Sequence, residues 1–239
     1  MSTLECRSST VGGEFQLDQR RPADSDWPMT LILIGQYDSP FVRRVAIALN
    51  LHGFGYEHRS WSTFADADKL AVYNPLRRVP TMVLENGEVL IESMAILDHL
   101  DEQAGPDRRL LPGAGADRRA ALKTCALATG LCDKMVSLVY ERVLHEETSD
   151  VWIARCTAQV SGVLTALEAE CAALVTPFWF GERPGHADIA VACAMQFLRE
   201  AHPDIAAMSD WPALTALTQR CEAMVAFSSV VQRFDPPRR

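Results

Sequence analysis

A serine followed by a proline stands where the sequence predicts the start of a helix, at Ser39-Pro40. Serine is a favoured helix N-cap, and proline is tolerated at the first helical position. A hydroxyl beside the free N–H groups of a helix N-terminus can also stabilise an anion. Ser39 is therefore both a predicted cap and a candidate catalytic hydroxyl.

Two further short motifs place polar groups next to predicted element boundaries. Arg78-Val79-Pro80 precedes a predicted strand, where proline commonly begins an edge strand and where an X-Pro bond can be cis. Glu92-Ser93 precedes a predicted helix, where an acidic residue and a hydroxyl are good capping chemistry. The free N–H groups of that helix could equally hold a carboxylate. Each motif therefore has a structural and a ligand-binding interpretation.

The cysteines and histidines do not form a metal or redox motif. Seven cysteines and six histidines occur, with no C-x-x-C and no H-x-x-x-H. We expect reduced, packed cysteines and no bound metal. In the segment from Gly185 to Asp188, the carboxylate follows Gly185 by three residues and can cap the start of a buried helix. Gly185 has no side chain, so half of the reciprocal cap is missing, and we expect a structural rather than a catalytic role.

The elements that position these residues follow a βαβαββα order in the first half of the chain. The apolar run Leu31–Ile34 is typical of a strand buried on both faces. Asn86-Gly87 between two apolar runs is a strong hairpin signal. These strands predict a mixed four-stranded sheet. The other predicted elements are a helix from Ser39 to His52 with Phe41, Val45 and Leu49 on one face, a strand over 56–61, a helix over 64–73, strands over 81–84 and 89–91, and a helix capped by Ser93.

The second half of the chain shows only helical periodicity. Helices are predicted over residues 116–147, 148–175, 187–201 and 211–223 and in the tail, the second of them capped at Thr148 or Ser149. We therefore expect an α/β domain over 29–104, a Gly/Pro-rich linker over 105–115, and an all-α domain over 116–239. Residues 1–28 are polar and aperiodic, and we interpret them as a disordered or extraneous arm outside the fold.

Charge and hydropathy exclude several functional classes. The formal net charge of −8 argues against a nucleic-acid partner and against an anionic membrane surface. No apolar run approaches the roughly 20 residues that span a bilayer, and the first residues lack the layout of a secretory signal. We therefore expect a cytoplasmic protein.

Four motifs, in their order along the chain, resemble those of the cytosolic glutathione transferases. They are YDSPFVRRV from Tyr37, NPLRRVPT from Asn74, Glu92-Ser93, and Gly181 followed by GHADI from Gly185. The likeness runs from Met29 to about Phe234 and looks closest to bacterial members whose first helix opens with Ser-Pro-Phe. It implies a thioredoxin-like N-terminal domain, a helical C-terminal domain, glutathione as co-substrate and a two-fold homodimer.

The resemblance also implies a role for each motif. Ser39 would stabilise the glutathione thiolate. A cis Val79-Pro80 bond would let the Val79 backbone pair with the cysteinyl part of the ligand, and Arg78 would hold the glycyl carboxylate. Ser93 and its helix N-terminus would hold the γ-glutamyl carboxylate, with Glu92 accepting from the ammonium group. The implied glutathione-binding residues are Phe41, Arg78, Val79, Pro80, Glu92 and Ser93.

The second substrate is expected in an apolar cleft between the domains, with Met135, Tyr140 and Trp152 as candidate lining residues. The chain also departs from related patterns. It has Ser39 where omega-like relatives have a disulfide-forming cysteine, and Asp38 where theta- and delta-like classes have their serine. Tyr37, near the end of the first strand, is an alternative catalytic hydroxyl.

Three functions fit these features. The first is an enzyme that conjugates the glutathione thiolate to an apolar electrophile. The second is a specialised glutathione user, namely an isomerase of the maleylacetoacetate type, a dehalogenase or a peroxidase. That isomerase would show Ser-Ser-Cys where this chain has Asp-Ser-Pro, which disfavours it. The third is a non-catalytic scaffold with the same fold. Retention of Arg78, Pro80, Glu92 and Ser93 disfavours a scaffold, whereas Asp38 keeps it open.

Overall fold

Four short strands form one mixed sheet in the first part of the chain. The structure is a computed structural model that describes residues 30–237, so the arm predicted over residues 1–28 and Cys6 lie outside the described residues. The strands are β1 (Leu31–Ile34), β2 (Tyr56–Arg59), β3 (Thr81–Val83) and β4 (Val89–Ile91). Their order is β2-β1-β3-β4, with β1 parallel to β2 and antiparallel to β3, and with β3 antiparallel to β4.

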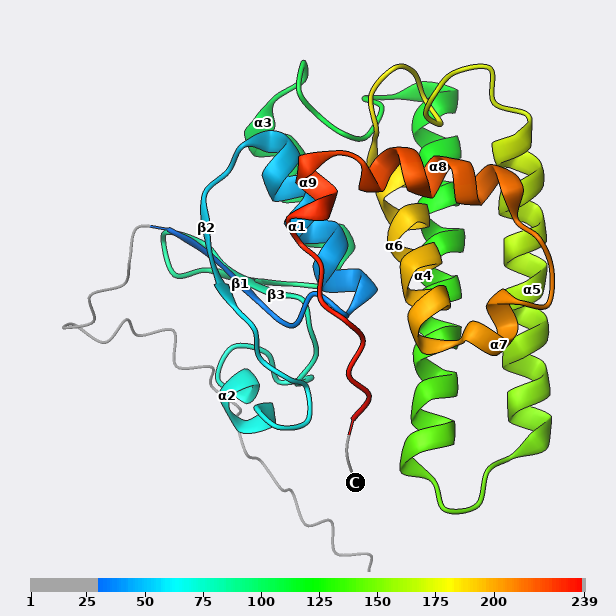
Figure 1. Ribbon diagram of the computed structural model, residues 1–239. Helices are drawn as coiled ribbons and strands as arrows, with labels where there is room; N and C mark the ends of the chain where they lie inside the picture. The colour runs from blue at the N-terminus through cyan, green and yellow to red at the C-terminus, as the bar shows by residue number, and fades with distance from the viewer. Residues whose placement is uncertain (1–29, 238–239) are drawn as a thin grey trace, which may run out of the picture.

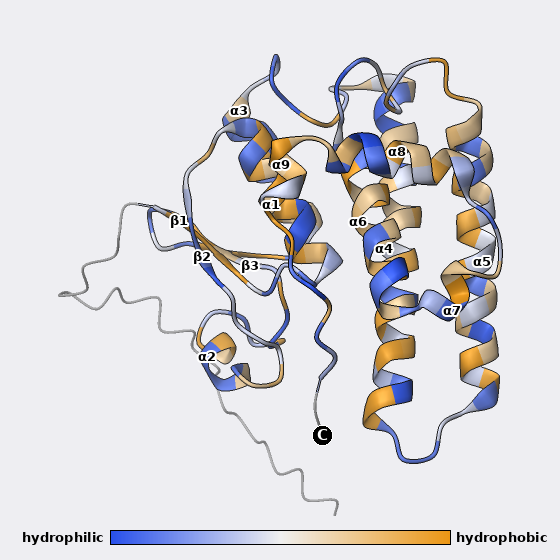
Figure 2. Cartoon of the chain, viewed as in Figure 1, coloured by the Kyte–Doolittle hydropathy of each residue, from blue (hydrophilic) through white to orange (hydrophobic). Residues whose placement is uncertain are grey.

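Hydropathy distinguishes the central strand β1 from the edge strand β2. The central strand β1 is apolar throughout, whereas β2 at the edge carries Tyr56, Glu57, His58 and Arg59 (Figure 2). Three of the four β1 residues are buried. The βαβαββα order and the mixed four-stranded sheet predicted from the sequence are thereby confirmed.

Helices α1 (Pro40–His52), α2 (Ala67–Ala71) and α3 (Ser93–Ala104) complete this domain. Helix α1 has buried residues nearly all around it, because α3 contacts one face and the helical domain contacts another (Figure 1). It ends at Gly53, which adopts the left-handed conformation with φ 73° that glycine tolerates. Helix α1 is therefore the element common to the sheet, to α3 and to the second domain.

The rest of the chain is helical, as predicted. Its two long helices, α4 (Gly115–Leu144) and α5 (Asp150–Ala172), pack side by side. Helix α6 (His186–Ala201) packs against α4 on one side and against α1 on the other (Figure 1). Helix α8 (Pro212–Glu222) crosses the bundle, and α7 (Pro203–Ala206) and α9 (Val225–Ser228) are single turns. Among the described residues, no helix is long and apolar enough to cross a membrane.

Most differences from the predicted elements lie at their ends. The strand predicted over 56–61 ends at Arg59, the helix predicted over 64–73 covers only Ala67–Ala71, and the strand predicted over 81–84 ends at Val83. Sequence periodicity does not resolve such boundaries, because the residues that follow can satisfy the same pattern in a turn. Of the two caps proposed for α5, Ser149 is the one observed, since its hydroxyl accepts from the Trp152 N–H.

The predicted cap of the buried helix α6 is confirmed. The Asp188 carboxylate accepts from the N–H of Gly185 and from that of Trp179, both at 2.9 Å. Asp188 is fully buried, and burial raises the pKa of its carboxyl group. Both carboxylate oxygens of Asp188 therefore accept hydrogen bonds within the fold.

The cysteines in the described part of the chain are free thiols. Six of the seven cysteines lie there, and all six are buried.

A buried carboxylate joins the α/β domain to the linker and to α6. Asp101 on α3 is 8% exposed and accepts from the N–H groups of Leu110 and Leu111, at 2.8 and 2.9 Å. The ring Nε2 atoms of His52 and His186 lie 3.3 and 3.2 Å from its Oδ1. Burial alone would raise the pKa of Asp101, but these imidazoles and the Leu110 N–H lower it well below its usual value. This network therefore stabilises the junction between the domains.

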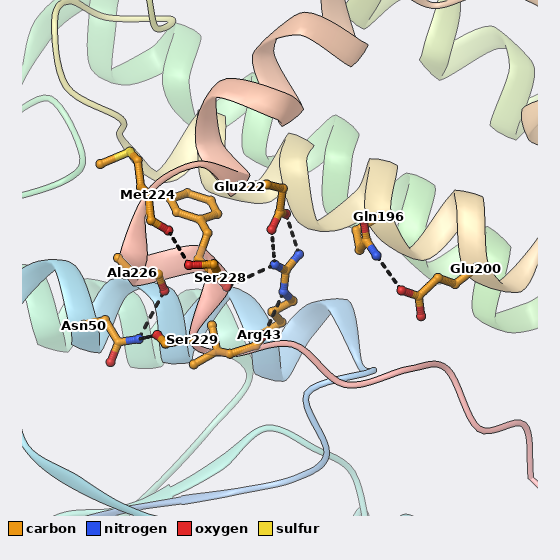
Figure 3. A network of polar contacts seen from close by, with 11 residues as sticks. Arg43, Asn50, Gln196, Glu200, Glu222, Met224, Ala226, Ser228 and Ser229 are labelled. Carbon is orange, nitrogen blue, oxygen red and sulfur yellow. Dashed lines mark hydrogen bonds and ion pairs between the residues drawn. The ribbon is translucent and has the colours of Figure 1, made fainter.

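The buried Arg43 joins α1 to the C-terminal end of the chain. Its Nη1 and Nη2 donate to the two carboxylate oxygens of Glu222 at 2.9 and 2.7 Å, and its Nε donates to the Val230 carbonyl at 3.0 Å (Figure 3). Nearby, Asn50 donates to the Ala226 carbonyl and to the Ser229 hydroxyl. These contacts fix α9 and the residues after it against α1.

Candidate active site

A cavity of about 1010 Å³ lies between the two domains. The first turn of α1, the loop after β2 and the loop before β3 contribute one side, and α4, α6 and the C-terminal segment contribute the other. Six aromatic side chains line it: Phe41, Trp61, Phe64, Tyr140, Phe197 and Phe234. The cleft predicted between the domains is therefore present, and Ser39 lies on its wall.

Ser39 is the N-cap of α1 and also faces this cavity. Its hydroxyl accepts from the Val42 N–H at 3.4 Å, and Pro40 occupies the first helical position. The hydroxyl proton remains available to a group in the cavity, because a serine oxygen can accept and donate at once. No acidic residue occupies the first turn of α1, so the positive end of the helix is uncompensated there. The structural and the catalytic interpretations of Ser39 are thus compatible.

The loop before β3 has the geometry that the resemblance implied. The Val79-Pro80 peptide is cis, and both Arg78 and Val79 line the cavity. The buried Asn74 fixes this loop by donating to the Arg78 carbonyl at 3.0 Å. Gly35 allows the close approach of the loop to α1, because a Cβ at its φ of 133° would lie 2.8 Å from the Val79 Cβ.

Arg78 lies between two carboxylates of different domains. It forms an ion pair with Glu92 at 3.4 Å, with both side chains more than half exposed. Asp133 on α4 also lines the cavity; burial raises its pKa and the nearby Arg78 guanidinium lowers it. Arg78 is thus accessible and held in place, which suits a residue that exchanges a surface partner for a ligand carboxylate.

The prediction that Ser93 caps α3 is wrong. Glu92 occupies the N-cap position, no side chain caps the helix, and Ser93 is its first residue. The Ser93 hydroxyl instead accepts from Nη1 of the buried Arg44 at 3.4 Å. Glu92 has φ 67°, an uncommon conformation for a residue with a side chain, and such residues cluster at functional sites. The free N–H groups of this turn therefore lack a cap from the chain itself.

Asp38 and the C-terminal segment meet beside Ser39. The Asp38 carboxylate accepts from the Asp235 N–H at 3.2 Å, and burial raises the pKa of Asp38. The Phe234 N–H donates to Glu200 of α6 at 2.8 Å, and the Phe234 ring packs edge-on against Phe197. Asp38 therefore holds the segment that closes one side of the cavity.

Tyr37 has a different environment from the one that a catalytic hydroxyl needs. Its hydroxyl lies 2.8 Å from the Tyr56 hydroxyl, and its ring stacks on His58 at 3.8 Å. Burial and the Tyr56 contact raise the pKa of Tyr37. Tyr37 does not line the cavity that contains Ser39. The geometry therefore favours Ser39 over Tyr37.

Of the three residues predicted to line the second-substrate cleft, the structure places only Tyr140 on the cavity wall. Met135 is fully buried in the helical core, where its carbonyl accepts from His202. Trp152 lies on α5, where Lys134 stacks over its ring. The reason is the period of α4, which turns Asp133, Ser137 and Tyr140 toward the cavity and Met135 away from it.

Several lining residues were not predicted. Trp61 and Phe64 come from the loop after β2, Asp133 and Ser137 from α4, and Phe197 from α6. Phe234 to Pro237 come from the end of the chain. Only the helical period of α4 carried a usable signal, because the other residues reach the cavity through the packing of segments far apart in the sequence. Among the described residues, no group of three or more His, Cys, Asp and Glu side chains could hold a metal ion.

Family models match both parts of the chain. A model described as "Glutathione S-transferase, N-terminal domain" matches residues 33–108, and one described as "Glutathione S-transferase, C-terminal domain" matches residues 150–220. The chain is also 28% identical over 203 residues to maleylacetoacetate isomerase of Pseudomonas aeruginosa, which covers 80% of this chain and 91% of that protein.

Solved structures agree with this assignment. A glutathione transferase of Methylobacterium radiotolerans, in complex with glutathione sulfonate, has a TM-score of 0.78 and 28% identity, covering 86% of this chain and 96% of that one. A glutathione transferase family member from Pseudomonas fluorescens Pf-5, with bound glutathione, has a TM-score of 0.72 and 31% identity, covering 87% of this chain and 100% of that one. On the fold, the cis Val79-Pro80 loop and these matches, the chain belongs to the glutathione transferase superfamily.

Proposed function

We propose that this chain is an enzyme that binds glutathione and transfers its thiolate to an uncharged aromatic electrophile. The observation that carries the proposal is the position of Ser39, at the N-cap of α1 beside the uncompensated positive end of that helix, and on the wall of an aromatic cavity. Glutathione supplies the nucleophilic sulfur when bound. The Ser39 hydroxyl and the free N–H groups of α1 hold that sulfur as a thiolate and lower its pKa.

The remaining glutathione contacts follow the predicted residues. Phe41 and the Val79-Pro80 backbone lie beside Ser39, with Arg78 next to them for the glycyl carboxylate. Glu92 and Ser93 lie at the start of α3, where they would bind the γ-glutamyl group. The uncapped α3 terminus and the accessible Arg78 are both suited to carboxylates. The relatives with bound glutathione and glutathione sulfonate support this assignment.

The cavity wall supports an uncharged aromatic second substrate. Its side chains are mainly aromatic, and the charged residues on it are Asp38, Asp133, Asp235 and Arg78. An anionic acid would therefore meet three carboxylates and an arginine already paired with Glu92. This balance disfavours an isomerase that acts on such an acid, as the similar maleylacetoacetate isomerase does. Aromatic rings can pack edge-on against Phe64, Tyr140 and Phe234.

The wider properties of the protein follow from the family. We propose a cytoplasmic homodimer, with domains over residues 29–104 and 116–239. Exposed apolar side chains on the α/β domain support a partner there, since Leu76 is 58% exposed and Met94 is 36% exposed. Light scattering coupled to gel filtration measures the oligomeric state directly, and a monomer at micromolar concentration would contradict the dimer.

The decisive test is a calorimetric titration with glutathione of the unaltered protein and of a Ser39→Ala variant. The ultraviolet absorbance of the bound thiolate is recorded against pH in both. We expect sub-millimolar binding to both proteins, and a bound-thiol pKa well below ~8.5 that rises only in the variant. No heat of binding at millimolar glutathione would instead indicate a scaffold that has kept the fold. Turnover of 1-chloro-2,4-dinitrobenzene against an anionic electrophile then tests the substrate class.

A further inference from the structure

Arg44 is a buried cation whose charge is nearly unpaired. It is 1% exposed, and its Nε and Nη2 atoms have no hydrogen-bond partner. Its Nη1 donates to the Ser93 hydroxyl at 3.4 Å, and the Cys125 thiol also lies beside it. Within residues 30–237, no carboxylate lies within ion-pair distance of the guanidinium. Arginine always carries its charge, so this burial is costly.

The one hydrogen bond of Arg44 is made to a residue at the start of α3, a helix terminus that no side chain caps. Ser93 is the first residue of α3, a twelve-residue helix with no side-chain cap and no acidic residue in its first turn. Because Ser93 accepts from Arg44, its own hydroxyl proton is left to donate away from the core. The first N–H groups of α3 have the same need for an acceptor. The Arg44 guanidinium, the Ser93 hydroxyl and the first N–H groups of α3 therefore lie together, and each of them favours an anion at this terminus.

We propose that Arg44 is a positioning residue that makes the start of α3 a carboxylate site, acting through Ser93 without touching the ligand. This inference rests on the proposed function, in which the γ-glutamyl carboxylate of glutathione occupies that site. The Arg44 charge lies behind the terminus and adds to the positive end of the α3 dipole. It also orients the Ser93 hydroxyl outward. The bound carboxylate in turn neutralises a charge that the chain leaves unpaired.

The nearest acidic residues do not take this role. Glu92, at the N-cap of α3, is exposed and is paired with Arg78. Asp101 is occupied by the linker N–H groups and by two histidines. Asp188 is occupied by the N–H groups of Gly185 and Trp179. An incoming carboxylate therefore supplies the counter-charge that the surroundings of Arg44 lack.

The test compares two ligands that differ by that carboxylate. Dissociation constants are measured by calorimetry for glutathione and for 4-aminobutyryl-cysteinyl-glycine, in which the α-carboxylate of the γ-glutamyl residue is absent. The proteins are the unaltered chain, Arg44→Met, Arg44→Lys and Arg43→Met. The last is a matched control, since Arg43 is the adjacent buried arginine and has its own carboxylate partner.

We expect the unaltered protein to prefer glutathione over the analogue, and Arg44→Met to lose about tenfold of that preference, or about 1.4 kcal/mol. Arg44→Lys should retain most of it, and Arg43→Met all of it. A purely structural role would weaken both ligands equally and leave the ratio unchanged, which would overturn the proposal. Failure of both Arg44→Met and a second variant, Arg44→Gln, to fold would also overturn it. Lack of glutathione binding by the unaltered protein would refute the proposed function itself.

Discussion

Two adjacent arginines of α1 are both buried, yet their surroundings are opposite. Arg43 is 3% exposed and donates four hydrogen bonds, two of them to Glu222 and two to the carbonyls of Val230 and Phe227 (Figure 3). Arg44 is 1% exposed and donates one long hydrogen bond, to Ser93. Consecutive helical residues point about 100° apart. Arg43 therefore faces the C-terminal end of the chain, and Arg44 faces the start of α3.

The difference separates buried charge that serves the fold from buried charge that awaits a ligand. A buried ion is tolerated when partners replace its water, and it is costly when they do not. The chain provides all the partners of Arg43, so its network is complete without a ligand. Arg44 has an incomplete set beside an uncapped helix. The completeness of the partners, and not burial, distinguishes the two roles.

The largest expected effect is the loss of stability in Arg43→Met. Removing this guanidinium leaves the Glu222 carboxylate and two carbonyls without their donor, and breaking a buried ion pair costs about 3–5 kcal/mol. Glu222 is partly exposed, with 26% of its side chain accessible, so water relieves some of this cost. We expect the free energy of unfolding to fall by about 3 kcal/mol, as measured by urea denaturation without ligand.

Glu222→Gln is the partner variant for this prediction. It keeps the shape and one acceptor oxygen, so we expect a smaller loss of about 1–2 kcal/mol. The double variant should lose less than the sum of the two single losses, because the residues share one interaction. Strict additivity, or a loss below about 1 kcal/mol in Arg43→Met, would mean that the Arg43 network does not hold the domains together.

The next effect concerns Asp101, a buried anion with a complete set of partners. Asp101→Asn removes the charge opposite His52 and His186 and leaves one linker N–H without an acceptor. We expect a loss of about 2–3 kcal/mol in the free energy of unfolding at pH 7. Like Arg43, Asp101 should be needed in the ligand-free protein, whereas glutathione binding to the folded variant should be unchanged.

The pH dependence of this network has a definite sign. The pKa of Asp101 is lower in the folded than in the unfolded chain, so its contribution is present above about pH 3.9 and is lost as the pH falls through the folded pKa. Burial lowers the pKa of His186, so acidification below about pH 6.5 also favours the unfolded chain. We expect acid to destabilise the protein below about pH 6.5, and the fall below about pH 4 to be shallower in Asp101→Asn. Parallel stability curves would contradict this.

Much of the fold was predictable because its signals are local. The apolar run of β1, the Asn86-Gly87 turn between β3 and β4 and the Asp188 cap each depend on residues close together in the chain. Element ends were less predictable, as in α2, where only Ala67–Ala71 is helical. The single turn α7 was missed, because four residues contain too little periodicity, whereas the short helix α9 falls in the tail that was predicted to be helical.

The candidate site was predictable only where a motif carries it. Three cavity residues were predictable because each belongs to a local feature, a helix start or a proline turn. They are Ser39, Arg78 and Val79. Phe197 and Phe234 line the same cavity because distant segments pack together, which no spacing in the sequence reports. The partners of Arg43 and Arg44 were equally hidden from the sequence, since Glu222 lies 179 residues beyond Arg43. Two neighbouring arginines look alike in a sequence and differ only in their three-dimensional partners.

A smaller effect applies the same comparison to uncharged groups. The Tyr37 hydroxyl is satisfied within the chain by Tyr56, at 2.8 Å. Tyr37→Phe should therefore lower the free energy of unfolding by about 1 kcal/mol, the usual net contribution of such a hydrogen bond. The pKa of the bound glutathione thiol should not change, in contrast to Ser39→Ala. A rise of the bound-thiol pKa in Tyr37→Phe would instead make Tyr37 the catalytic hydroxyl.

The smallest effect on the ligand-free protein is expected where burial alone would predict a large one, in Arg44→Met. Methionine fills a similar volume without a charge, so the variant loses one long hydrogen bond and is relieved of an unpaired buried cation. We expect the free energy of unfolding without ligand to change by less than about 1 kcal/mol, or to increase. With saturating glutathione we expect the unaltered protein to be the more stable of the two, because it gains more from the ligand by mass action. Denaturation curves of both proteins, with and without glutathione, measure this difference. A loss in Arg44→Met as large as that in Arg43→Met would show that both arginines serve the fold alone.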